Sequence, residues 1–270
     1  MTAQHTLASV QVVSADLDAL RAATRRLLRD AEELDEERVH EPSRLPGWNR
    51  AEVLTHLARN ADGTTRMVEA ATRGEVAAQY PGGVEQRGAD IAAGRDERMP
   101  LLLSDVRRSH DRMMDAWSAL PADGWNRVGR AISTDRTMRA ALWSRMREVE
   151  IHHVDLAVGY DPADWPVPFV SAALEEIFST FPARTSSRRP RVDAVYRIVS
   201  TDHDRAWRVT LDGAHVAVED ENGERSYDGE ARGWGCDVVA WLYGRDPSGA
   251  GILASGDVRV IRLPQWFPFA

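Results

Sequence analysis

Three prolines within the eight residues Asp161–Pro168 divide this chain into two parts whose hydrophobic residues follow different periods. From about residue 8 to 160, apolar residues recur at helical spacing, whereas after about residue 190 they mostly alternate in short runs that are typical of strands. Proline interrupts both kinds of element, so the segment marks a domain boundary or a firm bend. We therefore expect an α+β protein, with a helical part over residues 1–162 and a smaller α+β part over residues 163–270.

The pattern in the helical part predicts four long helices. They are expected from about residue 13 to 34, from Asn49 past Asn60, from 88 to 120, and from 137 to 158. Asn49 follows a break at Leu45–Trp48 and is a good N-cap residue. Four long helices joined by loops indicate a bundle, and bundle interiors commonly hold metal ions between facing helices.

The second part predicts a small α+β domain. Alternating runs predict strands, and Asp212-Gly213 between two of them indicates a hairpin turn. Ser186–Pro190 is expected to be an exposed loop. The expected strands are 192–199, 206–211, 214–218 and 258–261, and the expected helices are 170–178 and 235–243, the latter ending at Gly244.

Composition narrows the classes of function. A net charge of -8 argues against general nucleic-acid binding, which needs an excess of positive charge. No apolar run approaches the ~18 residues of a membrane span, and no secretory signal is visible, so a cytoplasmic protein is expected. The single cysteine, Cys236, excludes a disulfide framework and a cysteine-rich zinc site. All 34 basic residues are arginine, which excludes lysine Schiff-base chemistry.

Three side chains have the types and the spacing of a metal site. Glu148 and His152 are four residues apart on a predicted helix, so both lie on one face, one turn apart. His56 lies on a second predicted helix. Two imidazoles and one carboxylate that leave a coordination position open are the layout of a catalytic zinc site rather than a structural one.

Neighbouring residues offer alternatives for this site. His153 points about 100° away from His152 around the helix, so it is the weaker candidate ligand. Glu150 likewise does not lie on the helix face that carries Glu148 and His152. His110 is either a substitute ligand facing the bundle interior or a solvated helix residue. Asp155 is three residues after His152, and is either the carboxylate that orients its imidazole or an ordinary surface acid.

Several segments resemble one known family. Leu45–Arg50 followed by Val53–Asp62 resembles the first signature of the mycothiol-dependent maleylpyruvate isomerase family. Arg147–Asp155 resembles the second signature, and Val239–Arg245 resembles the ending of the family's C-terminal helix. The similarity covers nearly the whole chain in the right order.

The resemblance implies a DinB-like four-helix bundle followed by a smaller α+β domain that closes the substrate pocket. It implies that His56, Glu148 and His152 hold a metal, Zn²⁺ or another divalent ion, and that mycothiol is the thiol cofactor. A coordinating metal deprotonates a thiol, whose pKa is otherwise near ~8.5. In the family's isomerase the thiolate would add to the double bond of maleylpyruvate, and rotation and elimination would follow. In relatives the thiolate stays attached to an electrophile, which makes the enzyme an S-transferase.

The resemblance also implies an arginine that meets the carboxylates of the substrate. Arg245, next to Gly244, is the first candidate, and Arg87 and Arg232 come after it. A bidentate arginine suits carboxylate recognition, although an arginine at a helix end also offsets the helix dipole. Tyr80–Gly83 is either a loop over the mouth of the site or a simple turn.

Two other classes of function stay open on the sequence. One is a metal-dependent hydrolase that uses bound water in place of a thiol. The other is a non-catalytic module that binds a small ligand, although the intact set of three ligands argues against a decayed site. The expected partners are a small-molecule substrate and a low-molecular-weight thiol, with no nucleic acid and no membrane, and the expected state is a monomer or a homodimer.

Overall fold

The computed structural model of the chain divides into two compact units, Met1–Tyr160 and Asp161–Ala270. The residues described are 2–132, 134–184, 192–213, 215–221, 223, 225–246 and 249–268. The loop expected at Ser186–Pro190 and the first residue of the strand expected at 214–218 lie outside these ranges. Within the described ranges, no helix is both long enough and apolar enough to cross a membrane.

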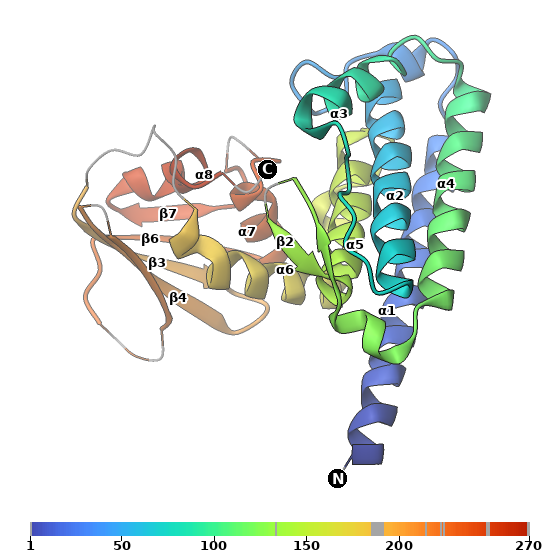
Figure 1. Ribbon diagram of the computed structural model, residues 1–270. Helices are drawn as coiled ribbons and strands as arrows, with labels where there is room; N and C mark the ends of the chain where they lie inside the picture. Colours follow the sequence, from blue (N-terminus) through green and yellow to red (C-terminus); the bar gives the residue numbers. More distant parts are fainter. Residues whose placement is uncertain are drawn as a thin grey trace. The chain divides into compact units, whose positions relative to one another are not determined.

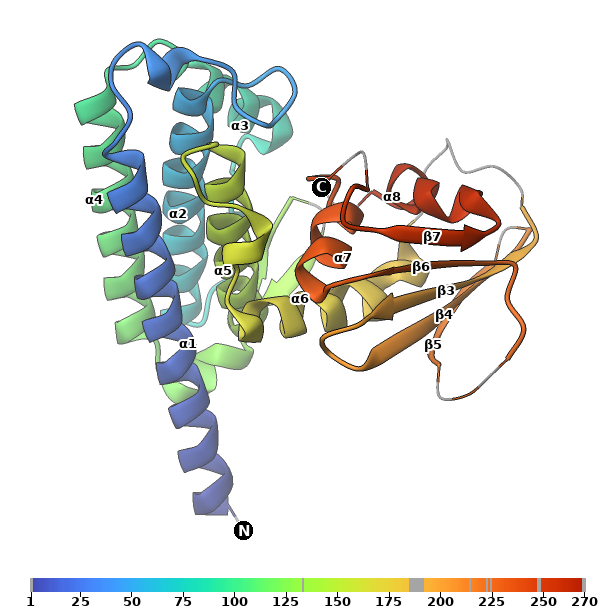
Figure 2. The same ribbon diagram turned by 180° about the vertical axis from the view of Figure 1, so that it is seen from behind.

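The first unit is a bundle in which four helices run alongside one another (Figures 1 and 2). These helices are α1 (Thr2–Ala31), α2 (Arg50–Thr72), α4 (Met99–Ala119) and α5 (Met138–Asp155). Shorter elements connect them: η1 (Arg38–His40), α3 (Gly83–Ala92), η2 (Ala122–Asn126), and the paired strands β1 (Val128–Arg130) and β2 (Asp135–Thr137). The core is apolar and includes Leu20, Leu27, Leu54, Leu57, Met113 and Trp117.

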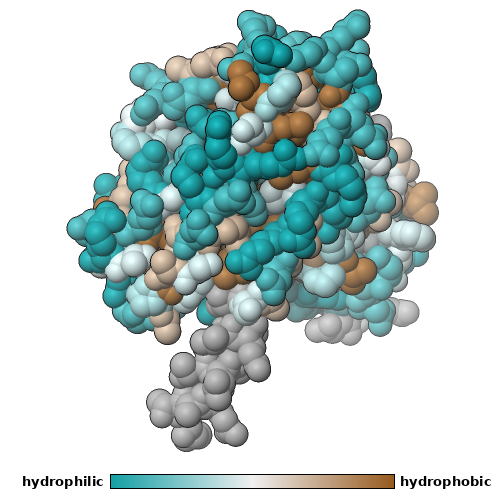
Figure 3. Space-filling model, turned by 90° about the vertical axis from the view of Figure 1, so that its right-hand side faces the viewer, coloured by the Kyte–Doolittle hydropathy of each residue, from teal (hydrophilic) through white to brown (hydrophobic). Residues whose placement is uncertain are grey.

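The outer face of α4 shows why this helix is amphipathic. Its inward residues belong to the core, whereas Arg107, Asp111 and Asp115 are exposed to solvent. The corresponding side of the molecule is mostly hydrophilic, with hydrophobic residues in small groups (Figure 3). The helical period that predicted this element therefore corresponds to one buried and one solvated face.

Asn49 caps α2, as the sequence predicted. Its side chain accepts a hydrogen bond from the Glu52 backbone at 2.9 Å, and the Asn49 backbone donates to Glu52 Oε2 at 2.9 Å. This reciprocal capping box gives hydrogen-bond acceptors to two backbone N–H groups at the start of the helix, those of Asn49 and Glu52. Glu52 is buried and also pairs with Arg95 at 2.9 Å. The start of α2 is thereby fixed, and with it the position of His56 at the end of the second turn.

The single long helix expected over residues 88–120 is wrong. The structure has α3 and α4, with a break between Ala92 and Met99. At Gly94 the chain passes so close to α2 that a Cβ atom would overlap the Thr55 side chain. Pro100 lies in the first turn of α4, where proline begins a helix readily because its missing N–H would have no partner there.

The second unit is built on a five-stranded sheet with strand order β5-β4-β3-β6-β7. Only β3 and β6 are parallel, and the other neighbouring strands are antiparallel. The strands are β3 (Ala194–Ser200), β4 (Arg205–Asp212), β5 (His215–Asp220), β6 (Gly229–Gly233) and β7 (Leu253–Gly256). The helices are η3 (Pro162–Asp164), α6 (Val167–Thr180), η4 (Phe181–Ala183), α7 (Gly235–Leu242), η5 (Val258–Arg262) and α8 (Leu263–Trp266).

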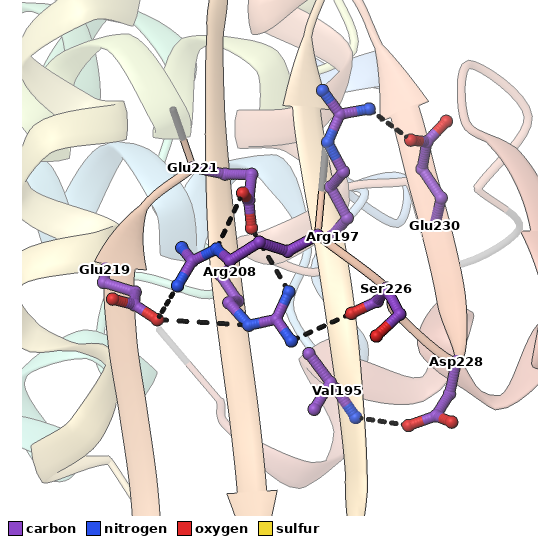
Figure 4. Close-up of polar contacts among 9 residues, drawn as sticks. Val195, Arg197, Arg208, Glu219, Glu221, Ser226, Asp228 and Glu230 are labelled. Carbon is purple, nitrogen blue, oxygen red and sulfur yellow. Dashed lines mark hydrogen bonds and ion pairs between the residues drawn. The ribbon is translucent and has the colours of Figure 1, made fainter. Parts of the chain in front are cut away.

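The two faces of this sheet differ in polarity. Tyr196, Ile198 and Trp207 are buried, and Trp207 stacks on Phe178 of α6 with ring centroids 4.0 Å apart. The other face carries ion pairs, among them Arg197–Glu230 at 2.6 Å across the parallel strands (Figure 4). The alternation of side chains along each strand separates the two sets.

Two details of the second unit differ from the expectations. The last strand, expected at 258–261, is wrong, because these residues form the 3₁₀ helix η5 and β7 precedes them. Asp257 caps η5 by accepting a hydrogen bond from the Arg259 backbone at 3.0 Å, which favours a helical turn over an extended chain. The hairpin at Asp212-Gly213 is confirmed, and Gly213 has a φ of 52° there.

Candidate metal centre

The structure brings His56 of α2 together with Glu148 and His152 of α5. Glu148 Oε2 lies 2.8 Å from His56 Nε2 and 3.2 Å from His152 Nε2. One candidate ligand atom from each of the three residues lies within 4.8 Å of the others. The rings of His56 and His152 meet edge to face, with centroids 4.7 Å apart. Two imidazole nitrogens thus converge on one carboxylate oxygen.

The protonation states of the cluster follow from burial and from these contacts. Burial lowers the pKa of His56 to about 4, although Glu148 opposes the shift. Burial disfavours the charged form of Glu148, but the contacts with His152 and His56 outweigh it and hold the pKa of Glu148 well below its usual range. Glu148 is therefore ionised and His56 neutral at neutral pH, which are the forms that bind metal ions.

Asp155 orients the second imidazole. His152 Nδ1 lies 2.8 Å from Asp155 Oδ2, and Asp155 is 1% exposed. Burial would lower the pKa of His152, but the hydrogen bonds with Asp155 and Glu148 raise it. An imidazole that donates from Nδ1 to a carboxylate presents Nε2 to the cluster, as metal-binding histidines commonly do.

Arg87 and Trp48 surround the outer edge of His56. Arg87 Nη2 lies 3.2 Å from His56 Nδ1, and because a guanidinium only donates, this nitrogen accepts and Nε2 carries the proton facing Glu148. The Arg87 guanidinium also lies 6.0 Å from the centroid of Trp48 and 5.9 Å from that of Tyr80. Trp48 meets His56 edge-on, with ring centroids 5.5 Å apart.

The donor set fits a zinc ion. Two imidazoles and one ionised carboxylate are the donor set found in some zinc hydrolases. Three protein ligands leave one coordination position for a further group. A cation that lies between this carboxylate oxygen and the two Nε2 atoms would take the place of the protons that the imidazoles share with the carboxylate. Metal coordination through His56 Nε2 would move the remaining proton to Nδ1, so Arg87 would then have to leave that nitrogen.

The alternative residues lie elsewhere in the bundle. His153 stacks on Tyr160 with ring centroids 3.8 Å apart, and its Nε2 lies 3.1 Å from Asp30 of α1. Glu150 accepts from Arg26 at 2.7 Å and from Tyr160 at 2.6 Å on that same side. His110 is buried and lines a groove between α1 and α4.

The arginines proposed from the sequence lie in different units. Arg87 is at the cluster, in contact with His56. Arg245 belongs to the second unit, where it follows α7 and donates from Nη1 to the Tyr243 carbonyl at 2.8 Å. Arg232 pairs with Glu230 at 3.2 Å. Gly244 has a φ of 70°, which is consistent with the helix end predicted there.

Arg145 was not identified from the sequence. It is 1% exposed on α5 and donates from Nη1 to the Leu57 carbonyl and to Asn60 Oδ1 of α2, both at 2.9 Å. The signal was available, because residue 145 precedes Glu148 by three positions and therefore faces the same side of the helix. Arginine is seldom fully buried unless its charge is paired, so a charged residue on a buried helix face points to a specific function.

Comparisons with known proteins agree with this architecture. The mycothiol-dependent maleylpyruvate isomerase and a histidine-to-alanine mutant of it each align with a TM-score of 0.74 and 21% sequence identity. Each alignment covers 90% of this chain and 92% of the solved one. The likeness confirms the predicted fold class, a DinB-like helical bundle with a smaller α+β domain. No sequence among the curated proteins matches the chain.

The helical part also matches a protein family by sequence. Residues 20–157, about half of the chain, match the family described as Mycothiol maleylpyruvate isomerase N-terminal domain. This range contains all three residues of the cluster, and it agrees with the resemblance drawn from the two sequence signatures. The chain therefore belongs to the mycothiol maleylpyruvate isomerase N-terminal domain family.

Proposed function

We propose that this protein is a metal-dependent enzyme of the maleylpyruvate isomerase type that uses mycothiol. The observation that carries the proposal is the convergence of His56 and His152 on one oxygen of an ionised Glu148, in a chain that belongs to this family. Zinc is the ion that this donor set suits best. The bound metal would keep the thiol of mycothiol ionised, and the thiol would supply the nucleophile.

The residues around the cluster have separate tasks in this proposal. Asp155 keeps the ring of His152 oriented, so that its Nε2 faces the metal position. Burial keeps His56 uncharged, so that the ring does not repel a cation. Arg87, held against two aromatic rings, supplies positive charge beside the site and therefore favours an anionic substrate.

The second unit completes the site in this proposal. Residues 163–270 would close the substrate pocket, and Arg245 would bind a carboxylate of the substrate. The isomerase and the S-transferase outcomes share the same nucleophile, and they differ in whether the sulfur leaves the carbon that it attacked. We propose the isomerase outcome because the family and the solved relative are both described by that reaction.

Turnover with and without mycothiol tests this proposal. Zinc-loaded protein is mixed with maleylpyruvate, and formation of fumarylpyruvate is followed by absorbance and NMR. We expect turnover only when mycothiol is present. Consumption of an electrophile with formation of a stable mycothiol adduct would favour the S-transferase outcome instead. Equal turnover of a substrate without any thiol would contradict the proposal and favour a hydrolase.

A further inference from the structure

Arg145 is a buried cation whose charge has no close anionic partner. Its side chain lies in the bundle interior, and its two hydrogen-bond acceptors, a backbone carbonyl and the amide oxygen of Asn60, are both uncharged. Among the described residues, no carboxylate lies within ion-pairing distance of it. Burying a charge without a partner is unfavourable, so such a residue needs a physical reason.

The free donors of Arg145 form a fork. Nη1 is used by α2, whereas Nε and Nη2 are buried and have no hydrogen-bond partner. The N–H bonds on Nε and Nη2 are the parallel pair on one side of a guanidinium, and a carboxylate accepts from such a pair with both oxygens. A water molecule would satisfy the hydrogen bonds without balancing the charge.

Tyr80 supplies a third unused donor in the same neighbourhood. Its hydroxyl is buried and makes no hydrogen bond of normal geometry. Burial raises the pKa of Tyr80, and the charges that act on it come from Glu148, Arg87 and Arg145. The Arg87 guanidinium lies 5.9 Å from the centroid of the Tyr80 ring and 3.2 Å from His56 Nδ1, and Arg145 lies on α5 one turn before Glu148. Arg145 and Tyr80 therefore lie near the candidate metal centre.

We propose that the Nε and Nη2 donors of Arg145, together with the Tyr80 hydroxyl, bind a carboxylate group of the substrate beside the metal centre. The ligand class is a small dicarboxylate, and this identification rests on the proposed function. The subsite lies wholly in the first unit, so it is separate from the role assigned to Arg245. Arg145 thus has two tasks: Nη1 ties α5 to α2, and the remaining donors face the ligand.

Binding of an unreactive dicarboxylate tests the subsite. Succinate is titrated calorimetrically into zinc-loaded full-length protein, with succinamide as the neutral probe of equal size. We expect succinate to bind and succinamide not to. Arg145→Lys keeps the charge but removes the fork, and it should weaken succinate binding about tenfold or more, because a charge-assisted hydrogen bond to the carboxylate is lost. Arg112→Met, which removes an exposed arginine paired with Asp62, should bind like the wild type.

Tyr80→Phe separates ligand binding from a structural role. It removes a buried hydroxyl that makes no hydrogen bond of normal geometry, so the melting temperature of the ligand-free protein should stay equal or rise, while succinate binding weakens several-fold. A tyrosine that only supports the fold would lower the melting temperature and leave succinate binding unchanged, which would overturn the proposal. Unchanged binding in Arg145→Lys, or loss of zinc in parallel with loss of succinate, would overturn it as well.

The same measurements distinguish a failure of the proposed function from a failure of the subsite. Succinate binding that depends on Arg145 in a protein without mycothiol-dependent turnover would contradict the function and support the subsite. Mycothiol-dependent turnover with an unchanged KM in Arg145→Lys would support the function and contradict the subsite.

Discussion

The two sides of α5 each carry a glutamate and a histidine, yet they differ in what balances the glutamate. On the side facing α1, Glu150 accepts from the guanidinium of Arg26 and from Tyr160. On the side facing α2, the contacts to Glu148 come from two imidazoles, and no arginine among the described residues forms an ion pair with it. The charge of Glu150 is balanced by a guanidinium, which cannot bind a metal ion, whereas the groups that contact Glu148 are imidazoles, which can.

The adjacent histidines show the same contrast. His152 has Asp155 on one nitrogen and Glu148 near the other, so its ring is oriented toward the cluster. His153 stacks flat on Tyr160, and burial lowers its pKa to about 4. Equal residue types at neighbouring positions therefore have different tasks, because a helix turns their side chains about 100° apart.

The two glutamates should differ most strongly in their effect on zinc binding. Glu148→Gln should reduce zinc affinity by more than about a hundredfold, because it removes a direct ligand, and removing an outer partner of a ligand already costs 10–100-fold. Glu150→Gln should keep its zinc, because that carboxylate lies on the other side of the helix. Metal analysis and competition with a chromophoric chelator measure both. Equal zinc affinity in the two variants would contradict the assignment.

The histidine pair is the second test. His152→Ala should lose zinc, and His153→Ala should keep it but lose about 1–3 kcal/mol of unfolding free energy, because it removes a buried ring that stacks on Tyr160. Metal content and urea denaturation of each variant give the result. Full zinc occupancy in His152→Ala, with loss in His153→Ala, would place the site on the α1 side of α5 and contradict the assignment.

Asp155→Asn tests whether the carboxylate beside His152 supports zinc binding. The amide keeps the size of the side chain but removes the charge that orients His152, so zinc affinity should fall about 10–100-fold. Asp30→Asn is the matched control on the α1 side, next to His153, and its zinc affinity should equal that of the wild type. An unchanged affinity in Asp155→Asn would mean that Asp155 does not orient the ligand.

Acid should destabilise the metal-free protein through its buried histidines. The pKa values of His56 and His153 are lowered from 6.5 to about 4 in the folded state, so between these pH values the unfolded chain binds more protons. Unfolding free energy should therefore fall as the pH drops from 6.5 to 4. His153→Gln should reduce that fall by at most about 3 kcal/mol. If unfolding free energy falls equally with pH in His153→Gln and in the wild type, protonation of His153 does not cause the fall.

The local part of the site was predictable from sequence, and the part that depends on packing was not. The spacing of Glu148 and His152 places them on one helical face, and Asn49 identifies the start of α2, so this pair and the helix that carries His56 follow from local rules. The contact between His56 and Glu148 depends on the packing of α2 against α5. The helical period places Arg145 on the same side of α5 as Glu148. Its hydrogen bonds to Leu57 and Asn60 depend on how α2 packs against α5, and a helical period carries no such information. The break at Gly94 likewise arises from contact with Thr55 of another helix.

The spectrum of cobalt-substituted protein on addition of mycothiol tests whether the cluster holds a metal that binds the thiol. We expect wild type and Glu150→Gln to develop a sulfur-to-cobalt charge-transfer band, and Glu148→Gln to develop none. Such a band reports a thiolate on the metal at this cluster. Its absence in cobalt-loaded wild type, or its persistence in Glu148→Gln, would contradict the claim that His56, Glu148 and His152 hold a metal that binds the thiol.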